Sequence, residues 1–523
     1  MRNLFRSKTR ACTSSSRLDM AQTCNRRPRD PQSPWQRTFA IAIVLWKHPP
    51  ASFSEKMKIR MQSIRLCSWQ NRHIFCRVGS NGCAAQLLGT EHFVGQAGAA
   101  ALGGMAVGLY EWTAAYLVVS LGFFFAPIYL QCQLTTIPEF LEARYNRWCR
   151  GLFVLISLIA YILAKIGICL FAGAVVFEVV AGIGMWSSAP IIIIGTALYT
   201  MAGGLTAVMW TDVVQWAIFV GGGLMGTVLS LDLVGGMSGL FQKLESFGLD
   251  SFPHVLRPPA GKEYPWPGML FGIPTVALWY WCVDQEMAQR VLSARNLSHA
   301  RLGTSIAGLM KVLPPFITVV PGMVARVLFE TCRASPAGGR EFARWCDANL
   351  DEAAGANRAY PLLVMLQFPE GVRGVMVASF LAAMMSSLAA VFNSAATVFT
   401  YDVYLRFFRE EGFASPRHLV FVGRLATAGL TLLSLLWLPV IQSNSRGVYI
   451  VAQTAMCHLA PPVSAIFVLA VAWRRANGQG ALAGLLVGCP VGVAQLVAAL
   501  MYQDTCAAMS SRDLAQDAPV IEW

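Results

Sequence analysis

The chain has 523 residues, of which 55% are hydrophobic and only 13% are charged, so it is far more apolar than an ordinary soluble domain. Lipid is therefore the solvent that this composition indicates. The formal net charge is +13, and residues 1–80 carry all of it, because they hold sixteen of the 41 basic side chains and three of the 28 acidic ones. The apolar remainder is neutral overall, which argues against a nucleic-acid partner.

Residues 1–83 form a basic head whose composition differs from that of the rest of the chain. Its compact apolar run, Phe39–Trp46, is too short to cross a bilayer, which takes about 20 residues, and no signal-peptide cleavage site follows it. Two interpretations are open. The head is either a disordered, solvated tail or a segment that binds anionic lipid at a cytoplasmic surface.

From about residue 84 onward, apolar stretches long enough to span a bilayer recur between short polar breaks. Their backbones must be helical, because lipid offers no hydrogen-bond partners. We therefore predict an all-α polytopic membrane protein with eleven spans. They are 84–108, 111–131, 151–178, 184–203, 206–234, 269–286, 302–329, 371–404, 420–441, 447–473 and 479–502.

The loops between these spans predict the orientation. Four short basic loops fall on one side when eleven spans are counted, and the positive-inside rule makes that side cytoplasmic. These loops are 142–150, 289–301, 404–418 and 473–480. The other side carries longer loops of mixed charge at 235–268 and 330–370. The second of them contains Cys332 and Cys346, and an oxidising exterior favours a disulfide between the two.

Ionisable side chains inside the predicted spans are costly in lipid, so by default they indicate a transport path or a binding site. Because they come from many spans, we expect them to gather in a polar centre enclosed by the helices. Those near a span end could instead extend to water, an alternative most open for Asp212, Glu286 and Asp402. The set consists of His92, Glu111, Lys165, Asp212, Asp284, Glu286, Lys311 and Asp402.

Two further patterns fit a ligand site. Residues 381–399 are apolar apart from small hydroxyl and amide side chains, which either pack helices closely or, at Ser386 and Ser387, supply oxygen ligands to sodium. The aromatic run at 279–281 is typical of a membrane interface, or of a surface that stacks on a sugar.

The chain lacks phosphate-loop, zinc-protease and serine-hydrolase signatures, so we expect no enzyme. Spacing alone does not separate a carrier from a channel.

Seven strings keep a characteristic order and spacing over residues 89–502. They are EHFVGQAG at 91–98, IPEFLEARY at 137–145, AGGLTAVMWTDVVQ at 202–215, YPWPG at 264–268, LWYWCVDQEMAQRVLSARNLSHA at 278–300, MSSLAAVFNSAATVFTYDVY at 385–404 and LAPPVSAIF at 459–467. Together they resemble the sodium/solute symporter family, in particular its sodium/glucose and sodium/myo-inositol cotransporter branch.

The resemblance implies a fold of two five-helix repeats in inverted orientation, with broken helices around a substrate site at the middle of the membrane. In this chain the transporter domain would be 84–502, with repeat one at 84–234, repeat two at 269–473 and an extra helix at 479–502. The head 1–83 lacks family character. Residues 503–523 would be a short extracellular tail, truncated relative to the family.

The resemblance also implies roles for residues at matching positions. The sugar or polyol would bind His92, Glu111, Tyr280, Trp281, Lys311 and Gln453. Sodium, the only metal implied, would bind backbone carbonyls of the first span and of span eight together with two hydroxyls, at Ala85, Leu88, Ala383, Ser386 and Ser387. Coupling and gating would involve Lys165, Asp212, Asp284 and Arg290. No organic cofactor is implied.

The chain departs from the family at several of these places. Leu87 stands where relatives have a sugar-binding Asn, Ala277 where a Thr is common, and Cys169 where an Asp follows the lysine of the third span. Ala383 is a small residue where relatives can have Ser. The loss of the Asn removes a hydrogen-bond partner of the polyol, which costs about 1–3 kcal/mol per unpaired group.

The function expected from this resemblance is sodium-coupled symport of a glucose-like hexose or of myo-inositol across the plasma membrane, by a multi-pass protein that works in the lipid bilayer. Two alternatives are open. One is a sugar-gated sodium conductance or sensor without net transport, and the other is a truncated isoform that transports nothing. The identity of the solute is also open, because relatives with different substrates share most of these residues.

Overall fold

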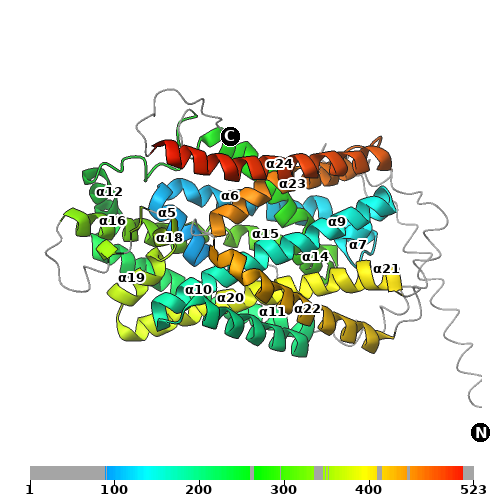
Figure 1. The fold of residues 1–523 in the computed structure, drawn as a ribbon, viewed down its shortest axis with the longest axis horizontal. Helices are drawn as coiled ribbons and strands as arrows, with labels where there is room; N and C mark the ends of the chain where they lie inside the picture. The colour runs from blue at the N-terminus through cyan, green and yellow to red at the C-terminus, as the bar shows by residue number, and fades with distance from the viewer. Residues whose placement is uncertain are drawn as a thin grey trace, which may run out of the picture. The chain divides into compact units, whose positions relative to one another are not determined.

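The structure is a computed structural model that describes residues 89, 91–259, 264–294, 296–334, 345–347, 349–351, 353–408, 415–443 and 448–510. The basic head 1–83 and the predicted sodium ligands Ala85 and Leu88 lie outside these residues. The chain divides into two compact units, and every described residue belongs to the second, Ser68–Trp523. The described residues are almost entirely helical, which confirms the all-α prediction (Figure 1).

The helical elements are α-helices with short π- or 3-10-helical turns between some of them. In chain order they are η1 (His92–Gln96), α5 (Ala97–Gly103), η2 (Gly104–Gly108), α6 (Leu109–Ser120), η3 (Leu121–Phe125), α7 (Ala126–Gln131), α8 (Ile137–Arg144), α9 (Arg147–Ala160), η4 (Tyr161–Ile166), α10 (Gly167–Ala181), α11 (Met185–Val234), α12 (Gly236–Ser246), η5 (Gly268–Gly272), α13 (Ile273–Leu278), η6 (Trp279–Val283), α14 (Gln285–Leu292), α15 (Leu297–Met310), η7 (Pro315–Val319), α16 (Val320–Ala334), α18 (Ala353–Ala356), α19 (Ala359–Gln367), α20 (Glu370–Val398), η8 (Phe399–Tyr404), α21 (Leu405–Phe408), α22 (Pro416–Ser443), α23 (Val448–Ala472) and α24 (Gly478–Ser510).

Among the described residues, nine helices are long and apolar enough to cross a membrane, against eleven predicted spans. One of the nine, His92–Gln131, combines the first two predicted spans although the backbone turns sharply at Gly104. The sixth predicted span is present as the shorter apolar helix Gly268–Val283. When His92–Gln131 is counted as two spans and Gly268–Val283 is added, each of the eleven predicted spans has a helical counterpart.

Two glycines with positive φ interrupt the membrane helices. Gly104 ends α5 with φ +67° and ψ −152°, and a Cβ at this position would lie 2.5 Å from the Phe252 carbonyl oxygen. Gly204 has φ +58° and ψ −163° and divides α11 into the segments Met185–Leu205 and Val208–Val234. Both conformations are in the left-handed region, where a side chain is strained. The bends therefore follow from glycine at these two positions.

The sixth span is interrupted by a different device. Helix η6 ends at Val283 and is followed by Asp284, whose backbone is extended with φ −65° and ψ 137°. The Asp284 carboxylate then accepts a hydrogen bond from the Glu286 N–H at 3.1 Å and so caps α14. The polar triplet at 284–286 therefore marks a helix break inside the membrane domain.

Helix α20 forms the middle of the packing. It contacts α11, α10, α14 and α22, and its buried face includes Ala383, Ser386 and Ser387. Helix α24, by contrast, leaves large apolar side chains such as Leu486 and Val487 exposed by 55% and 64%. In lipid such a surface is solvated by acyl chains. Helix α24 continues to Ser510, past residue 502, where the last span was predicted to end.

Candidate functional site

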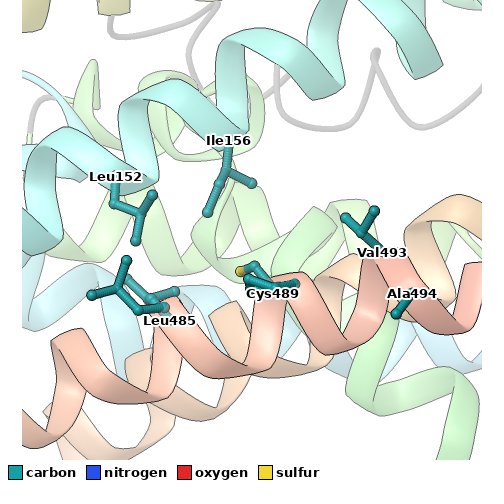
Figure 2. A pocket seen from close by; sticks show the side chains of 8 residues that line it. Leu152, Ile156, Leu485, Cys489, Val493 and Ala494 are labelled. Carbon is teal, nitrogen blue, oxygen red and sulfur yellow. The ribbon is translucent and has the colours of Figure 1, made fainter.

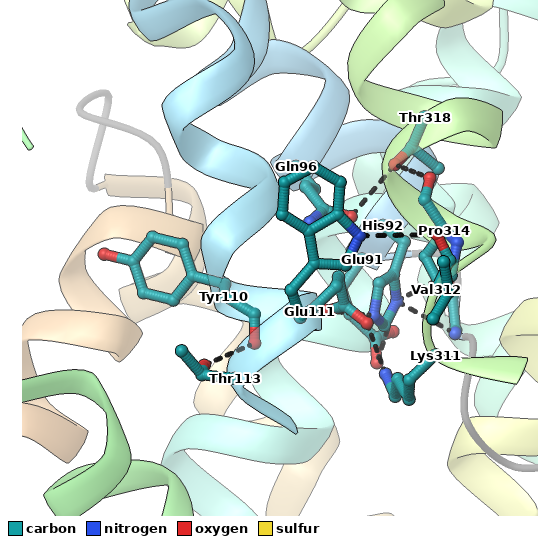
Figure 3. A network of polar contacts seen from close by, with 12 residues as sticks. Glu91, His92, Gln96, Tyr110, Glu111, Thr113, Lys311, Val312, Pro314 and Thr318 are labelled. Atoms are coloured by element: carbon teal, nitrogen blue, oxygen red, sulfur yellow. Dashed lines mark hydrogen bonds and ion pairs between the residues drawn. The ribbon is translucent and has the colours of Figure 1, made fainter. Parts of the chain in front are cut away.

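Glu111, in the first turn of α6, is the centre of a buried polar network. Its Oε1 lies 3.1 Å from His92 Nε2, and its Oε2 forms an ion pair with Lys311 Nζ at the end of α15 (Figure 3). The other ring nitrogen, His92 Nδ1, lies 3.0 Å from the Gly89 backbone nitrogen and 3.2 Å from the Gly89 carbonyl oxygen, and these contacts hold the ring beside the carboxylate. An ammonium, a carboxylate and an imidazole thus meet where each can exchange hydrogen bonds with a sugar hydroxyl.

Two aromatic rings of η6 connect to this network. The ring centroids of Tyr280 and Trp281 are 4.7 Å apart at an interplanar angle of 70°. Lys311 Nζ lies 4.4 Å from the Trp281 centroid, and Lys165 Nζ lies 4.2 Å from the Tyr280 centroid. Both distances are within the range of cation–π attraction. The structure therefore brings His92, Glu111, Lys311 and the aromatic pair into one region.

Gln453 is the remaining residue of the predicted sugar set. It lies in α23 and is partly buried. Helix α23 packs against η6, which carries Tyr280 and Trp281. Its helix therefore borders the aromatic pair, but no hydrogen bond joins the Gln453 side chain to the network among the described residues.

Lys165 in η4 is the cation of a second group. It forms ion pairs with both Asp284 and Glu286, and the Tyr161 hydroxyl donates to Asp284 Oδ1. The side chains of the two carboxylates are 4% and 3% exposed. Burying a charge is strongly unfavourable unless it is paired and hydrogen-bonded, and this arrangement meets that condition for the lysine.

Asp212 in α11 forms a third group with residues of two other spans. Its Oδ2 lies 2.8 Å from Arg290 Nη2, and its Oδ1 accepts a hydrogen bond from Ser386 Oγ at 2.6 Å. Arg290 Nη1 also donates to the carbonyl oxygen of Glu286 at 2.9 Å. This last bond links the second and third groups. The coupling cluster, as we call it, consists of Lys165, Asp212, Asp284, Glu286 and Arg290.

Asp402 lies apart from these groups, so the expectation of one polar centre is wrong for this residue. It accepts hydrogen bonds from Arg150 Nε at 2.7 Å and from Thr136 Oγ1 at 3.1 Å, because η8 packs against α9. The alternative that Asp212, Glu286 and Asp402 extend to water is also wrong. Their side chains are 0%, 3% and 0% exposed and each is in an ion pair.

Three of the predicted sodium ligands, Ala383, Ser386 and Ser387, lie on α20, and Ser387 faces the backbone just before η1. A Cβ at Gly89 would lie 2.3 Å from Ser387 Oγ and 2.2 Å from Glu91 Oε2, so this glycine lets the backbone next to predicted ligand Leu88 approach α20. Ala383 and Ser386 are on the buried face of the same helix. Hydroxyl and carbonyl oxygens are the ligands that a hard cation prefers, so the residues present fit sodium.

Sequence reasoning missed several participants. Gln96 lies beside η7, with its Oε1 2.9 Å from Thr318 Oγ1 (Figure 3). Tyr161 hydrogen-bonds Asp284. Glu286 was identified as an ionisable residue but was not assigned to coupling. A usable signal existed for Gln96, which follows His92 by four positions and so lies on the same helix face in an otherwise apolar run. Tyr161 offered none, because tyrosine is common in membrane spans.

A pocket of about 490 Å³ lies elsewhere, between α9 and α24 (Figure 2). Leu152 and Ile156 line it from α9, and the α24 side chains around Leu485 and Val493 line it from the other side. Its walls are apolar, so it offers almost nothing that could bind a sugar hydroxyl. The polar network, and not this pocket, is the candidate substrate site.

The model of the sodium:solute symporter family matches residues 71–488 of this chain. The chain belongs to the sodium:solute symporter family. Among its curated relatives, sodium/glucose cotransporter 4 of Mus musculus is 39% identical over 81% of this chain and 63% of its own length. Sodium/glucose cotransporter 1 of Ovis aries is 37% identical, covering 80% and 65%, and sodium/myo-inositol cotransporter 2 of Bos taurus is 40% identical, covering 82% and 65%.

The chain therefore spans slightly less than two thirds of the length of these relatives. Among solved structures, the substrate-bound outward-open state of a Na+-coupled sialic acid symporter matches with a TM-score of 0.65 and 20% identity, over 78% of this chain and 81% of the other. At that identity the likeness concerns the fold. It confirms the predicted sodium-symporter fold for this multi-pass membrane protein, whereas the boundaries of its two repeats stay a prediction.

Proposed function

We propose that this symporter moves a sugar or polyol, either a glucose-like hexose or myo-inositol, across the plasma membrane together with sodium. The observation that carries the proposal is the Glu111–Lys311 ion pair, with the Trp281 ring 4.4 Å from the lysine. A polyhydroxylated ring needs a charged group to bind its hydroxyls and an aromatic face for its apolar side. The printed names of the relatives, glucose and myo-inositol cotransporters, support the same class of solute.

Sodium would bind the hydroxyls of Ser386 and Ser387 with the carbonyl of Ala383, completed by carbonyls of the first span at Ala85 and Leu88. Ser386 on α20 also hydrogen-bonds Asp212 on α11. Asp212 in turn forms an ion pair with Arg290 on α14, so the two contacts connect α20 to α14 through α11. Sodium bound to the Ser386 hydroxyl would therefore alter the hydrogen bond that Asp212 of the coupling cluster accepts. Symport requires that sodium binds the outward-open and inward-open states with different affinity, and a site built from two separate spans can provide that difference.

The proposal is tested by uptake of labelled glucose, mannose, fructose and myo-inositol into cells that express the full chain, in sodium and in choline. We expect uptake of one of these solutes in sodium only, and its loss in Ser386→Ala/Ser387→Ala. Ser415→Ala, outside the spans, is the control and should leave uptake unchanged. Surface biotinylation shows whether each variant reaches the plasma membrane.

Two results would contradict symport. A sugar-dependent sodium current without sugar accumulation would make the protein a gated conductance or sensor. Surface-expressed protein that neither carries current nor takes up any of the four solutes would leave only a non-transporting isoform. Electrical recording from the same cells separates these two outcomes.

A further inference from the structure

Gln96 carries a buried amide whose hydrogen bonding is incomplete. The residue is 1% exposed, and its Nε2 has no hydrogen-bond partner among the described residues. Its Oε1 lies 2.9 Å from Thr318 Oγ1 in η7. A buried polar atom left without a partner costs about 1–3 kcal/mol. Such an atom in a membrane protein indicates a missing ligand or water.

The incomplete bonding does not depend on which way the amide is turned. Thr318 Oγ1 also lies 2.8 Å from the carbonyl oxygen of Pro314, and its single proton can be donated to only one acceptor. If that acceptor is Pro314, the amide must present its nitrogen to Thr318, and the amide oxygen is then the atom left over. In either orientation one polar atom of Gln96 remains available. A hydroxyl can pair with both kinds of atom, because it both donates and accepts.

The position of Gln96 relates this free atom to the candidate substrate site. Gln96 follows His92 by one helical turn on the same face, and His92 Nε2 bonds Glu111 at 3.1 Å. Thr318 lies on the element that directly follows Lys311 and Pro314 (Figure 3). We propose that Gln96 is a substrate-binding residue whose amide hydrogen-bonds one hydroxyl of the bound sugar or polyol. This inference rests on the proposed function and adds a specificity-determining contact to it.

The test measures equilibrium binding of labelled glucose and labelled myo-inositol to the purified full chain in sodium. Gln96→Leu removes both polar atoms at similar volume, and Gln96→Met is a second variant with an unbranched side chain. Losing one hydrogen bond should weaken binding roughly 3- to 10-fold. Gln242→Leu, on the exposed surface of α12, is the matched control and should bind like the parent.

A series of monodeoxy analogues of the bound solute distinguishes direct contact from a structural effect. If Gln96 contacts one hydroxyl, Gln96→Leu weakens binding of the intact solute and of every analogue except the one that lacks that hydroxyl. Equal weakening for all analogues, or no weakening at all, would overturn the inference. A parent chain that binds a solute but does not transport it would contradict the symport proposal and leave this inference standing. A parent chain that binds none of them overturns both.

Discussion

At the scale of single residues, the buried ion pairs determine which substitutions are costly. Glu111 and Lys311 are 9% and 0% exposed at their side chains, so removing one leaves the other charge away from water without this ion pair. Breaking a buried pair in this way costs about 3–5 kcal/mol, whereas removing both partners leaves no orphaned charge. Stability and transport are therefore expected to respond differently to single and double substitutions.

We predict that Lys311→Met and Glu111→Gln each lower the melting temperature of the purified protein in detergent, and that the double variant recovers most of the loss. All three should bind sugar more weakly, because each variant removes a charged hydrogen-bonding group from the network. The Arg358→Met variant, which breaks the exposed Arg358–Glu178 pair, is the control and should melt near the parent temperature. A double variant no more stable than either single variant would show that the loss of stability does not come from breaking the Glu111–Lys311 ion pair.

The sequence identified the ionisable residues of the site because charges in apolar spans are rare. It did not determine their partners, which depend on how spans distant in the chain pack. Asp402 illustrates the limit, since its pairing with Arg150 becomes evident only when η8 lies against α9. Gln96 illustrates another, because an amide in a span is less conspicuous than a charge. Ala85 and Leu88 lie outside the described residues, so their role stays a prediction.

At the scale of helices, apolar length predicted where the spans lie but not where they bend. The first two predicted spans, 84–108 and 111–131, are divided at residues 109–110, whereas the chain turns earlier, at Gly104. Span length follows from composition along the chain. A bend depends on a backbone conformation that only particular residues tolerate, and on what packs against it.

The two bent glycines provide a test of that distinction. Gly104→Ala meets both a strained backbone and the Phe252 carbonyl oxygen, 2.5 Å from the new Cβ, whereas Gly204→Ala meets strain with nothing within 4 Å. Backbone strain alone costs about 1–3 kcal/mol. We therefore expect Gly104→Ala to lower the melting temperature more than Gly204→Ala does. Equal losses would indicate that the contact with Phe252 relaxes without cost.

At the scale of the whole molecule, the orientation in the membrane can be tested at one covalent link. Cys332 and Cys346 form a disulfide with a Cα–Cα distance of 5.7 Å, in the loop predicted to be extracellular. Closing a loop of about 15 residues stabilises a fold by roughly 3 kcal/mol in the chain-entropy view. We expect a membrane-impermeant maleimide to label these two cysteines on intact cells only after a reductant is added.

The control for that experiment is Cys332→Ser/Cys346→Ser, which should remove the reductant-dependent labelling. Labelling that requires permeabilised cells would place the loop inside the cell and reverse the orientation. The fold and the candidate site would be unaffected by such a reversal, because they rest on packing within the chain.

The coupling cluster has an electrical consequence. With each side chain ionised, its three carboxylates and two cations leave one net negative charge among the spans. One bound sodium ion would cancel it, so the loaded protein would change conformation without moving net charge through the membrane field. The empty protein would carry the negative charge back, at about 2.3 kcal/mol per 100 mV. We expect voltage steps without sugar to evoke transient currents that shrink in Glu286→Gln, in which the cluster is neutral, and that persist in Glu178→Gln. The membrane potential would thus act on the return of the empty transporter.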